Sequence, residues 1–170
     1  MKLSSLEAIA KALQQAQARH LIVGGLAVAA HGHGRATFDI DLVLQLQPDN
    51  VKRAIVALSG LGYGPTVPVA AMDFADPVLR NSWIRDKGMV VFQLRSDLHP
   101  ETCIDLFVEE PFDFDREYAN ALVGEIAEGI TVRFIGLPAL IEMKRRAGRV
   151  KDLEDIRQLQ LLNDESELND

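Results

Sequence analysis

Two aspartates separated by one residue stand in an apolar stretch of the sequence. Over residues 38–45 side chains alternate in polarity, so Asp39 and Asp41 are expected on one face of a β-strand. Two ionised carboxylates side by side repel each other unless a cation lies between them. Proteins commonly hold Mg²⁺ with one or two carboxylates together with substrate phosphates. The pair therefore indicates a metal site; two solvated aspartates on an exposed strand are the alternative.

A third carboxylate, Asp105, stands alone in an apolar run over residues 102–108. Both faces of this strand are otherwise apolar, so the strand is expected to be buried, and a buried carboxylate needs a partner. A metal ion shared with Asp39 and Asp41 would supply one. An ion pair with an arginine such as Arg35 is the alternative.

A glycine pair, Gly24 and Gly25, separates a short apolar run at residues 20–23 from an alanine-rich segment at residues 25–33. A turn from strand to helix at this point would direct backbone N–H groups at an anion such as a phosphate. Gly34 could end the helix in a left-handed conformation. The glycine pair and the carboxylates together favour a site for metal and phosphate over a plain turn.

Two residues between the helix and the aspartates could serve the same site. Arg35 carries a permanent charge and could contact either a phosphate or the aspartates. Thr37 has the same parity as Asp39, so it could orient a carboxylate or simply satisfy strand propensity.

The order of these features resembles the nucleotidyltransferase superfamily: a Gly-Gly turn, a short helix, Arg-x-Thr-x-Asp-x-Asp, and a later single aspartate in a strand. It is most similar to the small bacterial proteins grouped with abortive-infection and toxin–antitoxin nucleotidyltransferases. The resemblance implies that Gly24 and Gly25 face a nucleoside triphosphate (NTP). It also implies that Asp39, Asp41 and Asp105 hold Mg²⁺ or Mn²⁺, as two ions when the NTP is bound.

The segment LIEMKRRAGRVKDLEDIRQL near the end of the chain carries the same resemblance. In that family the lysine at the position of Lys144 is associated with the nucleotide phosphates, and Arg149, Lys151 and Asp152 border the site. Without the resemblance, mixed charges at helical spacing are as well explained by a salt-bridged solvent face.

The expected activity is the transfer of a nucleoside monophosphate (NMP) from an NTP to a hydroxyl or phosphate acceptor. RNA, tRNA or a protein could be the acceptor, and a partner protein from a two-gene module is possible. Many active members of the family have a serine where this chain has Gly25, so a phosphate-contacting hydroxyl is absent. The alternative is therefore a non-catalytic, antitoxin-like regulatory protein that binds nucleotide on the same fold.

The elements that must position these residues suggest one α/β domain over residues 1–170, with a mixed sheet flanked by helices and a helical pair at the end. Ser4 is a possible cap of the first helix, and Trp83 is expected to pack rather than to stack on a base. We expect helices over residues 4–18, 25–33, 51–60, 77–87 and 115–123 and a pair after 136, strands over residues 20–23, 38–45, 89–94, 102–108, 125–126 and 130–135, and an edge or irregular connection over residues 61–70.

Composition excludes several classes of protein. The sequence is 48% hydrophobic and 25% charged, and its net charge of −7 argues against broad attraction to nucleic acid. A basic group around Lys144 could still receive a triphosphate or an RNA end. No apolar run approaches the roughly 20 residues that span a bilayer, so we expect a cytoplasmic protein. Cys103, the only cysteine, is expected to be a core thiol, and the last seven residues are expected to form a polar tail.

Overall fold

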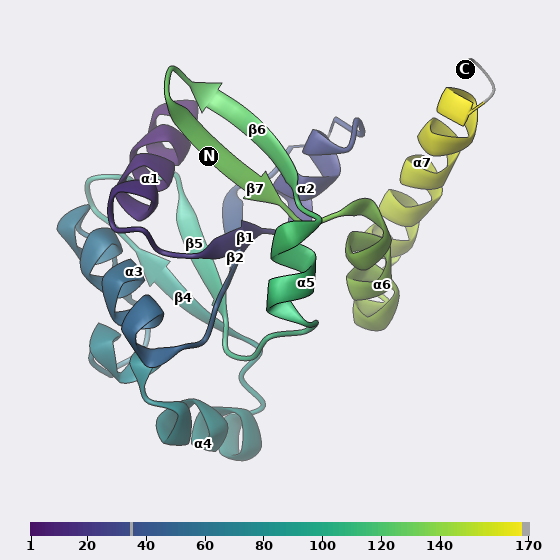
Figure 1. Cartoon of the computed structure of the whole chain (residues 1–170). Helices are drawn as coiled ribbons and strands as arrows, with labels where there is room; N and C mark the ends of the chain where they lie inside the picture. Colours follow the sequence, from purple (N-terminus) through teal and green to yellow (C-terminus); the bar gives the residue numbers. More distant parts are fainter. Residues whose placement is uncertain (35, 168–170) are drawn as a thin grey trace.

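The computed structural model describes residues 1–34 and 36–167, with residues 165–167 described in their backbone only. Within these residues the strands form one seven-stranded mixed sheet with the order β3-β4-β5-β2-β1-β7-β6 (Figure 1). This is the mixed sheet that the sequence predicts. The strands are β1 (His20–Ile22), β2 (Asp39–Leu44), β3 (Gly64–Pro65), β4 (Val91–Arg95), β5 (Cys103–Phe107), β6 (Leu122–Ala127) and β7 (Ile130–Phe134).

Helices flank this sheet. α6 lies near α5, and α7 packs on α6 and projects away from the sheet (Figure 1). Their bounds are α1 (Leu3–Gln15), α2 (Gly24–Ala30), α3 (Pro48–Gly60), the 3-10 helix η1 (Ala71–Ala75), α4 (Pro77–Lys87), α5 (Phe114–Ala119), α6 (Leu137–Ala147) and α7 (Val150–Glu167). The predicted helices, the β6–β7 hairpin and the final helical pair are all present. α7 continues to Glu167, so it includes the first four of the seven residues expected to form a polar tail, and the tail itself stays a prediction.

The centre of the sheet is a parallel pair, β2 and β5. Parallel strands need a long crossover, and here it contains α3, β3, η1, α4 and β4. On either side, β1 runs antiparallel to β2 and β4 runs antiparallel to β5. β3 is a two-residue edge strand, as expected for a segment rich in glycine and proline.

Strand alternation gives the two faces of the central strands opposite characters. On one face all even-numbered residues are buried in the main hydrophobic core, together with buried residues of α1 and α3. On the other face only Val43 is buried, and the remaining odd-numbered residues are half-buried or exposed. The even-numbered core residues are Ile40, Leu42, Leu44, Phe92, Leu94, Ile104 and Leu106.

The first two helices differ from the sequence expectation at their ends. The carbonyl of Lys2 accepts the N–H groups of Ser5 and Leu6, so α1 begins before Ser4 and has no serine cap. It ends at Gln15 rather than at residue 18. After α2 it is Gly32, with φ of 99°, that takes a positive φ, so the helix ends earlier than the expected cap at Gly34.

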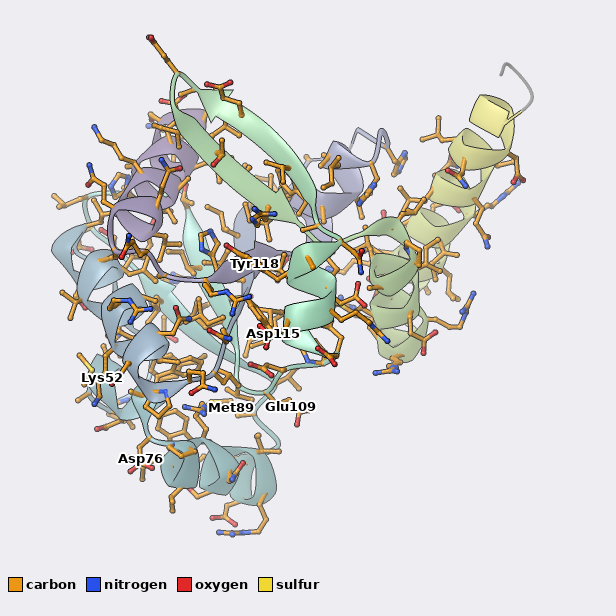
Figure 2. The ribbon with its side chains drawn as sticks, in the orientation of Figure 1. Lys52, Asp76, Met89, Glu109, Asp115 and Tyr118 are labelled. Carbon is orange, nitrogen blue, oxygen red and sulfur yellow. The ribbon has the colours of Figure 1, made fainter. Side chains whose placement is uncertain are left out.

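Aromatic side chains fix α4 and α5 to the sheet. Trp83 of α4 is 7% exposed and stacks on Phe92 at 5.3 Å between ring centroids, which confirms its predicted packing role. Tyr118 of α5, labelled in Figure 2, has the guanidinium carbons of Arg19 and Arg133 at 4.5 and 4.6 Å from its ring centroid. Such cation–π contacts attach α5 to β7, which contains Arg133, and to Arg19 directly before β1.

Candidate active site

Three polar side chains from neighbouring strands form one row on the half-exposed face of the sheet. Strand pairing places Asp41 of β2 opposite Asp105 of β5, and Asp105 opposite Gln93 of β4. Neighbouring strands lie about 4.8 Å apart, so the two carboxylates are close neighbours. The Gln93 amide donates a hydrogen bond from Nε2 to Asp105 Oδ1 at 3.1 Å. The fold therefore brings together two aspartates that are distant in the sequence.

The carboxylates of this row have more negative charge around them than positive charge. Burial, followed by the charges of Asp105 and Asp39, raises the pKa of Asp41 to about 6. The backbone of Gly25 and the ammonium of Lys144 oppose this rise only in part. Burial also raises the pKa of Asp105, and the charge of Asp39 adds to the effect. A cation placed between the carboxylates would therefore stabilise their ionised forms.

The glycine pair lies directly against Asp41. Gly24 is the first residue of α2 and has φ of 64°, and a Cβ at this position would overlap Asp41 Oδ2. Only glycine lets the helix begin this close to the carboxylate. The backbone N–H of Gly25 donates a hydrogen bond to the Asp41 side chain. The anion that this turn contacts in the structure is thus a carboxylate of the site itself.

Lys144 is a buried cation held between two acids of the next helix. It is 6% exposed, and its Nζ lies 2.6 Å from Asp155 Oδ2 and 3.4 Å from Asp152 Oδ1. Both aspartates are also buried. The alternative of a solvent-exposed ion-pair face is therefore wrong for these three residues, although Glu142 and Arg146 do form such an exposed pair.

Arg149 extends this ion-pair network to the surface. Its Nε and Nη2 lie 2.6 and 3.2 Å from the two carboxylate oxygens of Asp152, and its side chain is 63% exposed. Burial alone would raise the pKa of Asp152, but the hydrogen bonds and charge of Arg149, with the charge of Lys144, lower it below its usual value. The network fixes the α6–α7 junction and presents two cations beside the carboxylates.

These groups line a single cavity of about 460 Å³, a size typical of small-molecule sites. The sheet contributes the carboxylates, the β1–α2 turn contributes the glycines, and the α6–α7 pair contributes the bases. Apolar side chains complete the wall. The lining residues are Gly24, Gly25, Asp41, Val90, Val91, Asp105, Phe107, Leu140, Met143, Lys144, Ala147, Arg149, Lys151 and Asp152.

The carboxylate oxygens in this cavity are suitable ligands for Mg²⁺ or Mn²⁺. Asp41 and Asp105 offer only carboxylate oxygens, and two carboxylates plus substrate phosphates are a usual ligand set for Mg²⁺. In the described part of the chain no three His, Cys, Asp or Glu side chains form a group that could hold a metal ion. The two carboxylates alone are therefore the preorganised part of the expected triad.

Two other predicted residues, Asp39 and Thr37, do not line this cavity. Asp39 is exposed at the start of β2, paired with Cys103 and one row from the carboxylates. Thr37 lies before the strand, and its Oγ1 donates a hydrogen bond at 3.2 Å to the backbone carbonyl of Asp39. It therefore orients backbone rather than a carboxylate. Arg35 lies outside the described residues.

Sequence reasoning missed several members of the site. Gln93 could have been suspected, because it is a polar residue inside an apolar strand. Its hydrogen bond to Asp105, however, follows only from the strand order. Asp155 shares a helix face with Asp152 and gave no sign of contacting Lys144. The apolar wall gave no signal, because Val90 and Phe107 look like ordinary strand residues.

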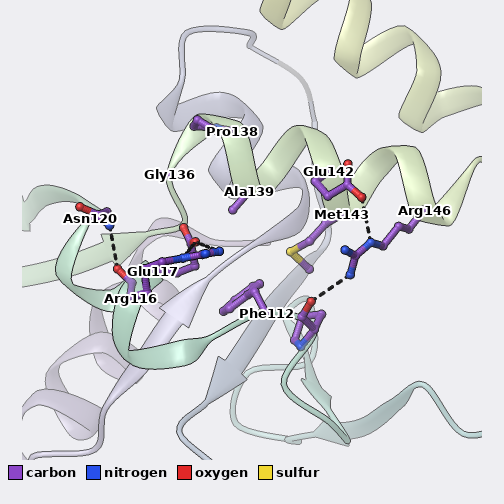
Figure 3. Close-up of a pocket in the computed structure, with 11 residues that line it drawn as sticks. Phe112, Arg116, Glu117, Asn120, Gly136, Pro138, Ala139, Glu142, Met143 and Arg146 are labelled. Atoms are coloured by element: carbon purple, nitrogen blue, oxygen red, sulfur yellow. Dashed lines mark hydrogen bonds and ion pairs between the residues drawn. The ribbon is translucent and has the colours of Figure 1, made fainter.

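A second cavity, of about 510 Å³, lies between α5 and α6, with Met143 lining both cavities (Figure 3). Two ion pairs border it, Arg116 with Glu117 at 2.8 Å and Arg146 with Glu142 at 3.0 Å. The carboxylate row and the buried lysine belong only to the first cavity, which is therefore the candidate active site.

Comparisons with known proteins agree with this arrangement at the level of fold. No protein-family model matches the sequence, and none of the curated proteins matches it. A crystal structure of ANT(2″)-Ia in complex with adenylyl-2″-tobramycin is similar, with a TM-score of 0.56 and 17% identity over 92% of this chain and 86% of that chain. A solution structure of the antibiotic-resistance factor ANT(2″)-Ia gives a TM-score of 0.55 and 18% identity over 92% of this chain and 81% of that chain. The chain has the predicted nucleotidyltransferase fold.

No helix in the described part of the chain is long and apolar enough to cross a membrane.

Proposed function

We propose that the protein is a metal-dependent nucleotidyltransferase, which moves an NMP from an NTP to a hydroxyl or phosphate acceptor. One observation carries the proposal: Asp41 and Asp105 are paired across β2 and β5 in a cavity that also contains Lys144 and Arg149. Carboxylates for a metal and cations for phosphate are the two charges that such a reaction needs. The fold adds support, because the similar structures include one with an adenylylated product.

Asp41 and Asp105 would hold the metal ion, and Asp39, one row along β2, would complete the set once an NTP is bound. Mg²⁺ or Mn²⁺, as two ions, would neutralise the triphosphate and make the acceptor hydroxyl more acidic. The raised pKa of Asp41 fits this role, because a bound cation would stabilise the ionised form of this carboxylate.

Side chains of the protein would take up the proton of the acceptor and neutralise the charge of the phosphates. The acceptor oxygen forms a bond to the α-phosphorus while the bond from that phosphorus to the bridging oxygen of the β-phosphate breaks, so pyrophosphate leaves. Asp105, on the side of the attacking oxygen, would accept the acceptor's proton. Lys144 and Arg149 would neutralise charge on the β- and γ-phosphates.

RNA, tRNA or a protein is the proposed acceptor, in a two-gene module of the toxin–antitoxin or abortive-infection kind. The support is the sequence resemblance around Asp39, Asp41 and Lys144. ANT(2″)-Ia is described with adenylyl-2″-tobramycin, so tobramycin is a second acceptor to test.

A regulatory protein that binds NTP without transferring it is the second candidate function. Gly25 favours it, because this position offers a backbone N–H but no hydroxyl, and that N–H already bonds to Asp41. In that case the cavity would bind a metal–NTP complex that remains intact.

Incubation with each of four α-labelled NTPs tests the proposal, with Mg²⁺ and with total tRNA, the protein itself or tobramycin as acceptor. Label should appear in one acceptor and be lost in the Asp41→Asn/Asp105→Asn double variant. Asp49→Asn on α3 is the matched control, because Asp49 is exposed and remote from the cavity. Saturable NTP binding without transfer would favour the regulatory protein, and no binding at all would refute both functions.

A further inference from the structure

The apolar wall of the candidate active site has no role in the chemistry proposed above. It consists of Val90 and Val91 from β4 and its approach, Phe107 from β5, and Met143 and Leu140 from α6. Val90 is 64% exposed although it is apolar, and Phe107 is only half-buried. An apolar surface inside a charged cavity indicates a ligand with both an ionic and an apolar part.

The wall lies at a defined distance from the reacting groups. Phe107 follows Asp105 by two residues on the same strand face, which places it about 7 Å further along β5. Strand pairing puts Val91 opposite Phe107, as it puts Gln93 opposite Asp105. Along β5, the row that contains Asp105 is therefore followed by a row formed by the apolar pair Val91 and Phe107. The ribose and base of a nucleotide extend from the α-phosphate over a similar distance.

We infer that Phe107, Val90 and Met143 form the nucleobase subsite for the donor NTP. This inference rests on the proposed binding of NTP in the cavity. The triphosphate occupies the part lined by Gly24 and Lys144, and the base stacks on the Phe107 ring, with Val90 and Met143 at its sides. Every polar group needed for phosphate lies at the glycines, the carboxylates or the α6–α7 junction, so the apolar wall is left for the base.

The chemistry of the wall sets the base preference. Hydrocarbon and thioether side chains offer no strong hydrogen-bond donor or acceptor to the edge of a base, and the carbonyl of Val90 is already used by the N–H of Val108. Stacking and apolar contact grow with ring area and are tolerant of substituents. The subsite therefore accepts ATP and GTP almost equally and binds CTP and UTP less well.

The opposite side of the carboxylate row is then left to the acceptor. Asp39, Cys103 and Arg95 lie there, each two residues before or after a member of the carboxylate row. Phe38 is the neighbour of Asp39 in the sequence and is 71% exposed. It is an exposed aromatic residue outside the apolar wall, so the test must separate Phe38 from Phe107.

Calorimetric binding to the full chain in Mg²⁺ buffer tests the inference, with the four NTPs and inorganic tripolyphosphate as ligands. The wild type should bind ATP and GTP within about threefold of each other and CTP and UTP about tenfold more weakly. Phe107→Leu, which keeps an apolar side chain but removes the ring, should weaken ATP about fivefold to tenfold and leave tripolyphosphate unchanged. Val90→Ser, at an exposed position that the fold tolerates, should weaken ATP by about threefold.

Phe38→Leu and Val56→Ser are the matched controls, because Val56 on α3 is 62% exposed and lies outside the cavity. Neither should change ATP binding by more than about twofold. Loss of ATP affinity in Phe38→Leu alone would overturn the inference, as would wild-type affinities for ATP, UTP and tripolyphosphate that are all equal. If neither NTP nor tripolyphosphate binds, the proposed function fails with the inference, and that result is distinct from loss of base discrimination alone.

Discussion

The two faces of β2, β5 and β4 differ as sharply as a core and an active site, although they are built from alternate residues of the same strands. On the even face Ile40, Leu106 and Phe92 are essentially fully buried. On the odd face Asp41 and Asp105 are only half-buried, with raised pKa values. The first face contributes apolar burial, whereas the second accumulates charge that opposes folding.

On each of these strands, the residues that stabilise the fold and those of the proposed site are only one position apart. A carboxylate pair would be too costly within the even face, because no water or cation could reach it. On the odd face the cavity has room for water and for a cation. Substitutions at adjacent positions should therefore have opposite effects.

Replacing Asp41 by Asn should have the largest effect, on transfer alone. We expect NMP transfer to fall about 10³-fold, about 4 kcal/mol, because a metal-binding and charge-stabilising group is lost. Unfolding in urea should show that the variant is no less stable than the wild type at pH 7. A parallel loss of stability and transfer would break the distinction between the faces.

Leu106→Ala should have the next largest effect, on stability alone. Truncation of a fully buried leucine costs about 3 kcal/mol in the free energy of unfolding, and Leu106 is 0% exposed. Cys103→Ala on the opposite face of the same strand is the control and should cost less than about 1 kcal/mol, since Cys103 is only half-buried. Urea denaturation measures both, and equal costs would contradict the comparison.

Gly24→Ala should affect both stability and function, because the glycine supports a functional carboxylate through the backbone. The substitution should cost about 2 kcal/mol from positive φ and from overlap with Asp41. Gly88→Ala isolates the strain, since Gly88 has φ of 60° but open space around its Cα. Transfer should fall only in the Gly24 variant; equal effects on stability in the two variants would show that Asp41 does not limit this position.

The smallest expected effect is on the pH dependence of stability. The pKa of Asp41 is raised to about 6 in the folded protein, so the folded state holds its proton over a pH range where the unfolded chain has lost it. The free energy of unfolding should therefore fall between about pH 4 and pH 6, by about 1–2 kcal/mol after allowance for solvent screening. Chemical denaturation in metal-free buffer should show this fall in the wild type and a smaller one in Asp41→Asn.

Much of the sheet could be predicted because its signals are local. Alternation in β2 located Asp39 and Asp41 on one face, and the Gly-Gly sequence located the β1–α2 turn. The same alternation predicted that Asp105 and Cys103 lie on one face of their strand. None of these signals says which strands are neighbours. The resemblance implied only that Asp105 shares a metal site with Asp39 and Asp41, and the structure adds the pairing of β2 with β5, in which Asp41 lies opposite Asp105.

The remaining differences depend on tertiary contacts. Charges on α6 and α7 have the pattern of a solvated surface, and only the packing of the two helices buries Lys144 between Asp152 and Asp155. Asp39 belongs to the same motif as Asp41 but lies where the strand begins, so it is exposed. The functional roles of all the predicted site residues remain predictions, those of Arg35, Thr37 and Arg149 included.

The parallel pairing of β2 and β5 also determines when the site can exist during synthesis of the chain. Its carboxylates cannot meet until the whole crossover, with α3, β3, η1, α4 and β4, has emerged and folded. Lys144 and its partners follow near the C-terminus. A ribosome-bound chain that stops before α7 therefore has no complete cavity.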